Sequence, residues 1–228
     1  MYQACIKVIL GCCLAFGLCA AENIVFKEGE HYEKVDLSVL AQDSVKQHIA
    51  QDKNKVQVIE FFSYGCYWCG QVHAPLAKWA TTKQDVAMYH YPAVFNSVWR
   101  DMGRVYLSVQ QLDNSLEIDQ AIFTAVHTKH LRVWEEKVIK TLITEHGGNV
   151  EVFAQYYDSF VIQSKLKKSE DLANAYKVDA TPYVIVHGPY ASYITSLSKT
   201  RDKDTLVQVV DYLVMREQKI YQPVSSQS

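Results

Sequence analysis

Hydrophobic residues follow this chain with two different periods, and the change between them separates strands from helices. Residues 56–62 are almost wholly apolar, with β-branched and aromatic members, which is typical of a strand buried on both faces. Residues 65–81 change to a helical period, with a kink expected at Pro75. The apolar run 86–91 predicts the next strand. Strands that alternate with a helix in this way indicate an α/β fold.

A long helical region follows, from about residue 95 to residue 168. Ile118, Ile122 and Ala125 recur at the spacing of one helix face. The turn 147–149 interrupts the region, and its last residue, an asparagine, is expected to cap the next helix. We therefore expect a helical insertion over about 95–168, between two groups of strands.

The last part of the chain returns to strands. Residues 183–187 predict one strand, 188–189 a turn, and 190–197 the returning strand of a hairpin. Asp202 then opens a final helix with an apolar stripe.

The first residues predict a secretory signal rather than part of the fold. The apolar run 8–18 follows a short segment with one lysine and ends in the small residues 19–21. This pattern predicts a signal peptide over 1–21, cleaved after Ala20 or Ala21. A membrane-anchoring helix is the alternative, but the run is shorter than the roughly 20 residues that span a bilayer. A lipoprotein site at Cys12 is a further alternative, with little apolar sequence before it.

The remaining chain, 22–228, is predicted to form one domain, because it contains no internal repeat. Residues 32–37 predict an edge strand and 45–50 a short helix ahead of the first buried strand. Hydrophobic residues make up 49% of the chain, which suits a globular domain. The formal net charge of −2 argues against a nucleic-acid surface, which needs clustered lysine and arginine.

Four of the 6 cysteines lie within the predicted signal peptide, so cleavage leaves only Cys66 and Cys69. A disulfide across two intervening residues closes a very small loop and stabilises a fold little. We therefore expect the pair to be available for chemistry. The motif Cys66-Tyr67-Trp68-Cys69 follows the apolar run 56–62 and precedes a helical pattern, which is the context of a redox dithiol.

The two cysteines are expected to differ in reactivity. The first turn of a helix presents unpaired N–H groups and the positive end of the helix dipole, so a cysteine there is stabilised as the thiolate that attacks disulfides. Cys66 is therefore predicted to be the reactive sulfur. Cys69 lies one turn further into the helix, where it is more shielded, and is predicted to resolve the mixed disulfide.

A second motif, Thr181-Pro182, stands directly before the strand 183–187. A proline is tolerated as the first residue of a strand, so its position alone does not require a cis bond. Taken together, these features resemble the DsbA family of periplasmic thiol:disulfide oxidoreductases, within the thioredoxin superfamily. The resemblance covers nearly the whole of residues 22–228. It depends on the two motifs, the helical region and three short segments, Glu60-Phe61-Phe62-Ser63, Tyr89-His90 and Asp158-Ser159-Phe160.

The resemblance implies a thioredoxin-like fold with a helical insertion domain and a function as disulfide donor to reduced or unfolded exported proteins in the periplasm. Cys66 would be the nucleophile, Cys69 the resolving cysteine, and Pro182 a cis-proline that binds substrate together with Thr181. It also implies a membrane quinone-linked partner that re-oxidises the dithiol. No metal or organic cofactor is expected, and a monomer is favoured.

Three positions depart from the best-known oxidants of that family. Tyr67 and Trp68 replace a Pro-His pair, so no imidazolium stabilises the thiolate, and we expect the pKa of Cys66 to be lowered but above the ~3.5 of the strongest oxidants. Met88 stands where those oxidants often have a lysine. Threonine at position 181 is shared with several isomerases and reductases.

Glu60 is a single acid within an apolar strand. Burial there is expected to raise the pKa of its carboxyl group and to let it exchange a proton with Cys69. A buried acid without a role is the alternative. Trp68 similarly has two interpretations, an exposed contact for substrate or a side chain packed against the insertion.

Two other functions stay open. The first is a disulfide isomerase or reductase that keeps the dithiol reduced. The second is a module that binds a soft metal through both cysteines, with His73 as third ligand, although two sulfurs leave a tetrahedral site incomplete. At its helical spacing His73 is expected to be a surface residue, and His127 and His130 are expected to lie on a solvated face.

Overall fold

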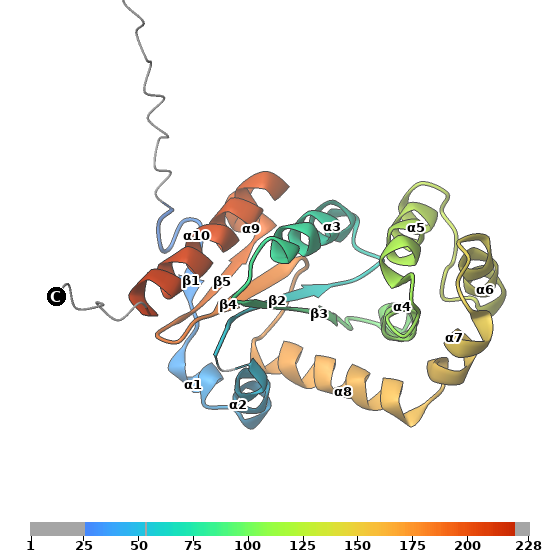
Figure 1. Cartoon of the computed structure of the whole chain (residues 1–228), viewed down its shortest axis with the longest axis horizontal. Helices are drawn as coiled ribbons and strands as arrows, with labels where there is room; N and C mark the ends of the chain where they lie inside the picture. Colours follow the sequence, from blue (N-terminus) through green and yellow to red (C-terminus); the bar gives the residue numbers. More distant parts are fainter. Residues whose placement is uncertain (1–25, 53, 222–228) are drawn as a thin grey trace, which may run out of the picture.

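A mixed sheet of five strands forms the centre of the computed structural model, which describes residues 26–52 and 54–221 (Figure 1). The predicted signal peptide lies outside these residues. The strand order is β1-β5-β4-β2-β3. The strands are β1 Glu33–Lys34, β2 Val56–Phe62, β3 Val86–Pro92, β4 Tyr183–His187 and β5 Ser192–Ser196.

Strand β2 lies in the middle of the sheet, parallel to β3 and antiparallel to β4. All seven of its residues are buried, which explains the unbroken apolar run. The predicted bounds of β2 and β4 are confirmed. The edge strand β1 is shorter than the predicted 32–37, and β5 is shorter than the predicted 190–197.

Alternate residues of β2 face two different layers of helices. Val56 and Val58 share a core with α3 (Tyr67–Thr81) and α10 (Lys203–Tyr221). Ile59 and Phe61 share the opposite core with α2 (Asp43–Ile49) and α8 (Phe160–Ala175). The two-residue period of a strand is the reason for this division. Helix α3 continues through Pro75 as one helix.

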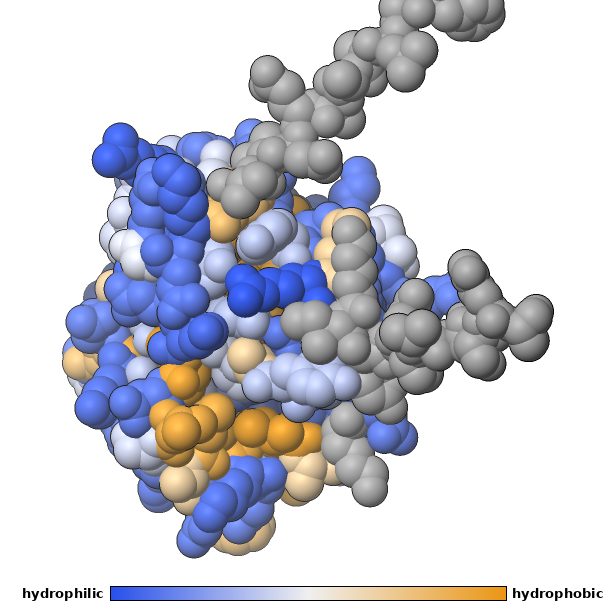
Figure 2. All heavy atoms as spheres, turned by 90° about the vertical axis from the view of Figure 1, so that its left-hand side faces the viewer, coloured by the Kyte–Doolittle hydropathy of each residue, from blue (hydrophilic) through white to orange (hydrophobic). Residues whose placement is uncertain are grey.

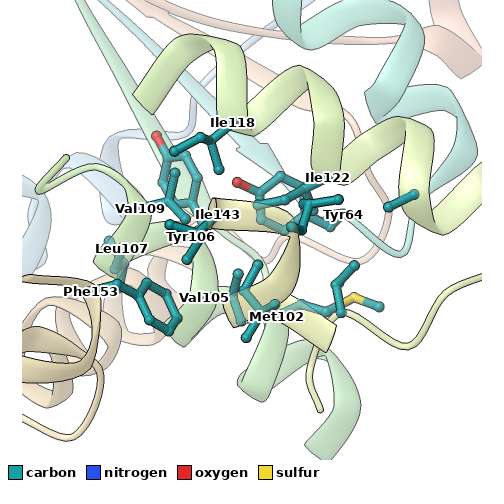
Figure 3. Close-up of a cluster of buried hydrophobic side chains, with 14 of the residues drawn as sticks. Tyr64, Met102, Val105, Tyr106, Leu107, Val109, Ile118, Ile122, Ile143 and Phe153 are labelled. Atoms are coloured by element: carbon teal, nitrogen blue, oxygen red, sulfur yellow. The ribbon is translucent and has the colours of Figure 1, made fainter. Parts of the chain in front are cut away.

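The helical insertion lies between β3 and β4 and has a core of its own (Figures 1 and 3). Its helices are α4 Ser97–Val109, α5 Ser115–His127, α6 Glu136–Glu145, α7 Val150–Tyr157 and α8 Phe160–Ala175. Helix α8 therefore continues past the predicted end at residue 168, and its second half packs under the sheet through Leu172. The core of the insertion also includes Phe62, Tyr64 and Cys69, so it reaches the CxxC motif.

Two helices of the insertion begin with the expected capping chemistry. The Asn149 side chain accepts a hydrogen bond from the N–H of Val152 at 3.0 Å, as predicted. Ser159 caps α8 in the same way, through the N–H of Ile162 at 3.3 Å. The remaining helices are the short α1 (Leu37–Leu40), the 3-10 turn η1 (Ala50–Asp52) and α9 (Leu197–Thr200).

The face at the left of Figure 1 is largely hydrophilic, and hydrophobic atoms gather in its lower part (Figure 2). None of the helices within residues 26–52 and 54–221 combines the length and apolar character needed to cross a bilayer.

Candidate active site

Cys66 is the N-cap residue of α3. Its backbone is extended, and its sulfur accepts a hydrogen bond from the N–H of Cys69 at 3.3 Å. The thiol thus stands where a serine or aspartate side chain normally caps a helix, among N–H groups that lack partners within the helix. Both cysteines are free thiols, Cys66 partly exposed and Cys69 buried.

The pKa of the Cys66 thiol is lowered from its ordinary value of 9.0 to about 6. The hydrogen bond from the Cys69 side chain is the largest cause, and burial opposes it. The Thr181 side chain and the N–H groups of Cys69 and Trp68 lower the pKa further. A lowered pKa without a histidine between the cysteines agrees with the expectation from the sequence.

Cys69 has the opposite environment. It is fully buried, and burial raises the pKa of its thiol well above 9.0. The hydrogen bond to Cys66 and the negative charges of Cys66 and Glu60 raise it further. Cys69 therefore remains a protonated thiol at neutral pH, whereas Cys66 is mainly a thiolate.

The loop before β4 completes the site. The Thr181–Pro182 peptide bond is cis, and Pro182 is buried. The backbone oxygen of Thr181 lies 3.4 Å from the sulfur of Cys66. Antiparallel pairing explains this proximity, because the end of β2 and the start of β4 are neighbours, with Phe61 opposite Tyr183.

The two residues between the cysteines are exposed. Tyr67 and Trp68 each have 56% of their surface accessible, and their ring centroids lie 5.3 Å apart. Trp68 is therefore not buried against the insertion. A third exposed ring, Phe95, stacks on Trp99 at a centroid distance of 5.1 Å. The Trp99 indole nitrogen comes so close to Gly65 that a β-carbon there would lie 2.7 Å from it, so this close approach requires glycine.

Glu60 is fully buried, but the expected rise in its pKa is wrong. Its Oε2 atom lies 2.7 Å from Nδ1 of His73 and 2.7 Å from Nδ1 of His90. Burial acts to raise the pKa of the carboxyl group, but the charge of His73 and hydrogen bonds from both histidines lower it to about 2. Local sequence indicates only the burial of this acid, because the cation beside it belongs to another element, α3.

His73 is not the expected surface residue. It is 4% exposed, and its ring lies against Phe62 at a centroid distance of 4.4 Å. Its Nε2 atom lies 3.4 Å from Oδ2 of Asp119 on α5. Helical spacing on α3 alone could not reveal this burial, because α5 of the insertion is what covers His73.

Asp119 is a buried acid that the sequence argument missed. It accepts hydrogen bonds from the Tyr64 hydroxyl and from Nε2 of Gln110, the latter at 3.3 Å. Its position directly after Ile118, in the apolar stripe of a helix, was the available signal.

His127 was also placed wrongly, because it does not lie on a solvated face away from the cysteines. Its Nε2 atom lies 2.8 Å from the backbone oxygen of Tyr64, and the centroid of its ring lies 5.8 Å from that of the Tyr67 ring. His130 is exposed, as expected. His127 also lines a pocket of about 370 Å³ between α3 and α5, together with His73 and Asp119.

Within the described residues, Glu60, His73 and His90 form the one group of side chains whose donor atoms lie close enough together to bind a metal ion. Both Nδ1 atoms, however, lie at hydrogen-bond distance from the same carboxylate oxygen. A nitrogen that donates a proton to this oxygen has no lone pair for a metal. The cluster is accordingly a hydrogen-bonded buried acid, and neither cysteine belongs to it.

Comparison with known proteins gives a consistent result. Residues 57–211 match the family described as DSBA-like thioredoxin domain. The thiol:disulfide interchange protein DsbA of Azotobacter vinelandii is 29% identical over 72% of this chain and 75% of its own length. The protein of that name from Burkholderia cepacia is 26% identical over 92% of this chain and 95% of its own. The crystal structure of Pseudomonas aeruginosa DsbA has the same fold, with a TM-score of 0.73, 23% identity, and coverage of 87% of this chain and 97% of that one.

The lowered pKa of Cys66 predicts how the stability of the reduced protein depends on pH. An acidic group with a lowered pKa stabilises the folded state above its unfolded pKa, here 9.0, and this contribution disappears as the pH falls through about 6. The oxidised protein has no such thiolate. We expect the free energy of unfolding of the reduced protein, minus that of the oxidised protein, to rise from pH 6 to pH 9.

Urea denaturation of both forms at a series of pH values measures this difference. The reduced Cys66→Ser variant is the control. Its free energy of unfolding, measured over the same pH range, should show no such rise. A difference that stays constant between pH 6 and pH 9 would contradict the stabilised thiolate.

Proposed function

Because the chain belongs to the family of DSBA-like thioredoxin domains and is a thiol:disulfide oxidoreductase, we propose that it donates a Cys66–Cys69 disulfide to reduced proteins. One observation supports this direction above all. The pKa of Cys66 is lowered to about 6 while that of Cys69 is raised, so the two sulfurs are suited to different steps.

The first step forms a mixed disulfide. A substrate thiolate attacks the sulfur of Cys66, the Cys66–Cys69 bond breaks, and Cys69 leaves with the electron pair. Because the pKa of Cys69 is raised, its sulfur takes up a proton and becomes an unreactive thiol. The second step completes the donation. A second substrate thiolate attacks the substrate sulfur, and Cys66 leaves as a thiolate, which its low pKa makes a good leaving group.

The substrate would bind in an extended conformation beside the loop that contains Thr181 and Pro182. The proximity of this loop to the Cys66 sulfur supports the idea that its backbone pairs with the substrate, as in strand addition. The exposed rings of Tyr67 and Trp68 would provide apolar contact next to the reacting sulfur.

The cellular setting belongs to the same proposal. The predicted signal peptide would direct the protein to the periplasm, where its substrates would be reduced or unfolded exported proteins. A membrane quinone-linked partner would re-oxidise the dithiol. Secretion of the full chain with and without residues 1–21 tests the first point, and the redox state of the dithiol in strains that lack quinones tests the second.

The cysteine variants test the reaction directly. We expect Cys66→Ser to lose all oxidation of a reduced substrate such as ribonuclease, because the attacked sulfur is gone. Cys69→Ser keeps Cys66. When it is prepared with glutathione on Cys66, a substrate thiolate that attacks the Cys66 sulfur expels glutathione, and the resulting mixed disulfide should accumulate because no Cys69 thiol can resolve it. The oxidised substrate and the mixed disulfide are both visible by mass spectrometry under non-reducing conditions. Full activity of Cys66→Ser would overturn the proposal.

A disulfide isomerase or reductase remains the second candidate, because Thr181 precedes the cis-proline as in several such proteins. The reduction potential measured against glutathione separates the two. We expect a value between the ~−270 mV of thioredoxin and the ~−120 mV of strong oxidants, because the Cys66 thiolate stabilises the reduced form but its pKa of about 6 is less lowered than in the strongest oxidants. A value near −270 mV, with refolding of scrambled ribonuclease faster than oxidation of the reduced form, would favour the second candidate.

The role of the exposed rings is tested with two substrates. Trp68→Ala should lower kcat/KM for a peptide dithiol about fivefold to tenfold, because loss of a buried aromatic contact costs about 1 kcal/mol or more. The same variant should leave the reaction with dithiothreitol nearly unchanged, since this small molecule does not reach the ring. Equal effects on both substrates would show that Trp68 acts on the thiols and not on binding.

A further inference from the structure

His73 lies on α3 one turn after Cys69, and both nitrogens of its ring face carboxylates. Nδ1 is 2.7 Å from Oε2 of Glu60 on β2, and Nε2 is 3.4 Å from Oδ2 of Asp119 on α5. A neutral imidazole donates from one nitrogen only, whereas the imidazolium ion donates from both. With both carboxylates ionised, only the imidazolium ion makes both hydrogen bonds. Burial lowers the pKa of His73, but the charge of Glu60 and hydrogen bonds to Asp119 and Glu60 raise it to about 10.

His90 is a natural contrast to His73. Its Nδ1 lies at the same distance, 2.7 Å, from the same Glu60 oxygen. Among the described residues, Asp119 accepts a hydrogen bond from His73 and none from His90. Burial and the charge of His73 lower the pKa of His90, so this ring is a neutral donor. Glu60 thus has two N–H donors, and only one of them is a cation.

The other groups around His73 add no charge at neutral pH. Tyr64 precedes α3 and Tyr106 lies on α4, and burial raises the pKa of both hydroxyls well above 10.0. Cys69 is a protonated thiol. Glu60 and Asp119 are therefore the two anions that face His73, and His73 is the cation between them.

We propose that His73 is a positioning residue that keeps Glu60 ionised close to Cys69, which lies one turn before His73 on the same face of α3, and that Asp119 holds His73 in this place. The inference deepens the proposed function and rests on it. It also assigns a task to the insertion, because Asp119 belongs to α5 and reaches the thioredoxin part of the molecule through this imidazole and the Tyr64 hydroxyl.

The consequence concerns the mixed disulfide. Cys69 can attack the sulfur of Cys66, which re-forms the Cys66–Cys69 bond, expels the substrate thiolate and releases the Cys69 proton to solvent. This attack requires the Cys69 thiolate. A fixed negative charge on Glu60 disfavours a second negative charge nearby, so the attack is slow. The substrate's own second thiol then has time to complete the donation.

The experiment follows the attack by Cys69 alone. The protein is prepared with glutathione on Cys66, and release of glutathione is measured from pH 5 to pH 8.5 for wild type, His73→Gln and His90→Gln. Wild type should show one rise, which follows the Cys69 thiolate. In His73→Gln the still buried Glu60 has lost its cation, so its own titration should appear as a second inflection between pH 5 and pH 8.

On the acid side of that inflection Glu60 is neutral. A fall of about one unit in the Cys69 pKa raises the thiolate fraction about tenfold. The less basic thiolate is a weaker nucleophile, so the rate constant of its attack falls about threefold. We therefore expect His73→Gln to release glutathione about threefold faster than wild type there. Adding Glu60→Gln should abolish the inflection, whereas His90→Gln, which removes a neutral donor, should show none.

Two results would overturn the inference. One is a pH profile of His73→Gln like that of wild type, or like that of His90→Gln, which would leave His73 only a structural hydrogen bond. The other is a stoichiometric zinc ion in the purified protein, because both Nδ1 atoms would then be ligands. If His73→Gln fails to fold by circular dichroism, Asp119→Asn takes its place. Asp119→Asn should give the same inflection with smaller amplitude. A pH profile of Asp119→Asn without this inflection would equally refute the inference.

Failure of the proposed function would look different. The oxidised wild-type protein would then fail to oxidise reduced ribonuclease, whatever the pH profile of glutathione release from Cys66.

Discussion

Stabilisation of a sulfur anion at the first turn of α3 is the interaction on which the chemistry of this protein depends. The Cys66 sulfur takes the place of a capping oxygen and accepts the N–H of Cys69. A helix end provides such N–H groups without any further charged residue. The hydrogen bond from the Cys69 thiol lowers the pKa of Cys66 most, and these N–H groups add to it, so the pKa falls to about 6 although the intervening residues are tyrosine and tryptophan.

The sheet holds everything else in register with that helix end. Strand β2 leads directly into α3, and its antiparallel neighbour β4 begins with the Thr181–Pro182 loop. Because β2 is buried on both faces, a layer of helices must cover each side, and α8 of the insertion supplies part of one. The insertion is therefore a structural part of the sheet's cover as well as a neighbour of the active site.

The two cysteines have the same side chain, and their thiol pKa values differ because their surroundings differ. Cys66 has N–H donors and partial exposure, while Cys69 has an apolar core and the carboxylate of Glu60. Glu60 can remain charged in this core because the charge of His73 lies beside it and because His73 and His90 both donate hydrogen bonds to it. A buried anion without such partners would be protonated instead.

Local pattern was sufficient for the strands 56–62 and 183–187, for the helix after Cys66 and for the cap at Asn149, because apolar period and capping chemistry act over a few residues. The reactive role proposed for Cys66 also follows from local sequence, since a helix N-terminus acts on its own first turn. The surroundings of Glu60, His73, Asp119 and His127 could not be derived in this way. Most of their partners lie 13 to 63 positions apart in the sequence. They meet when α3 and β3 pack beside β2 and when α5 packs against α3. The charge of a buried acid depends on those distant partners, so only the tertiary structure decided it.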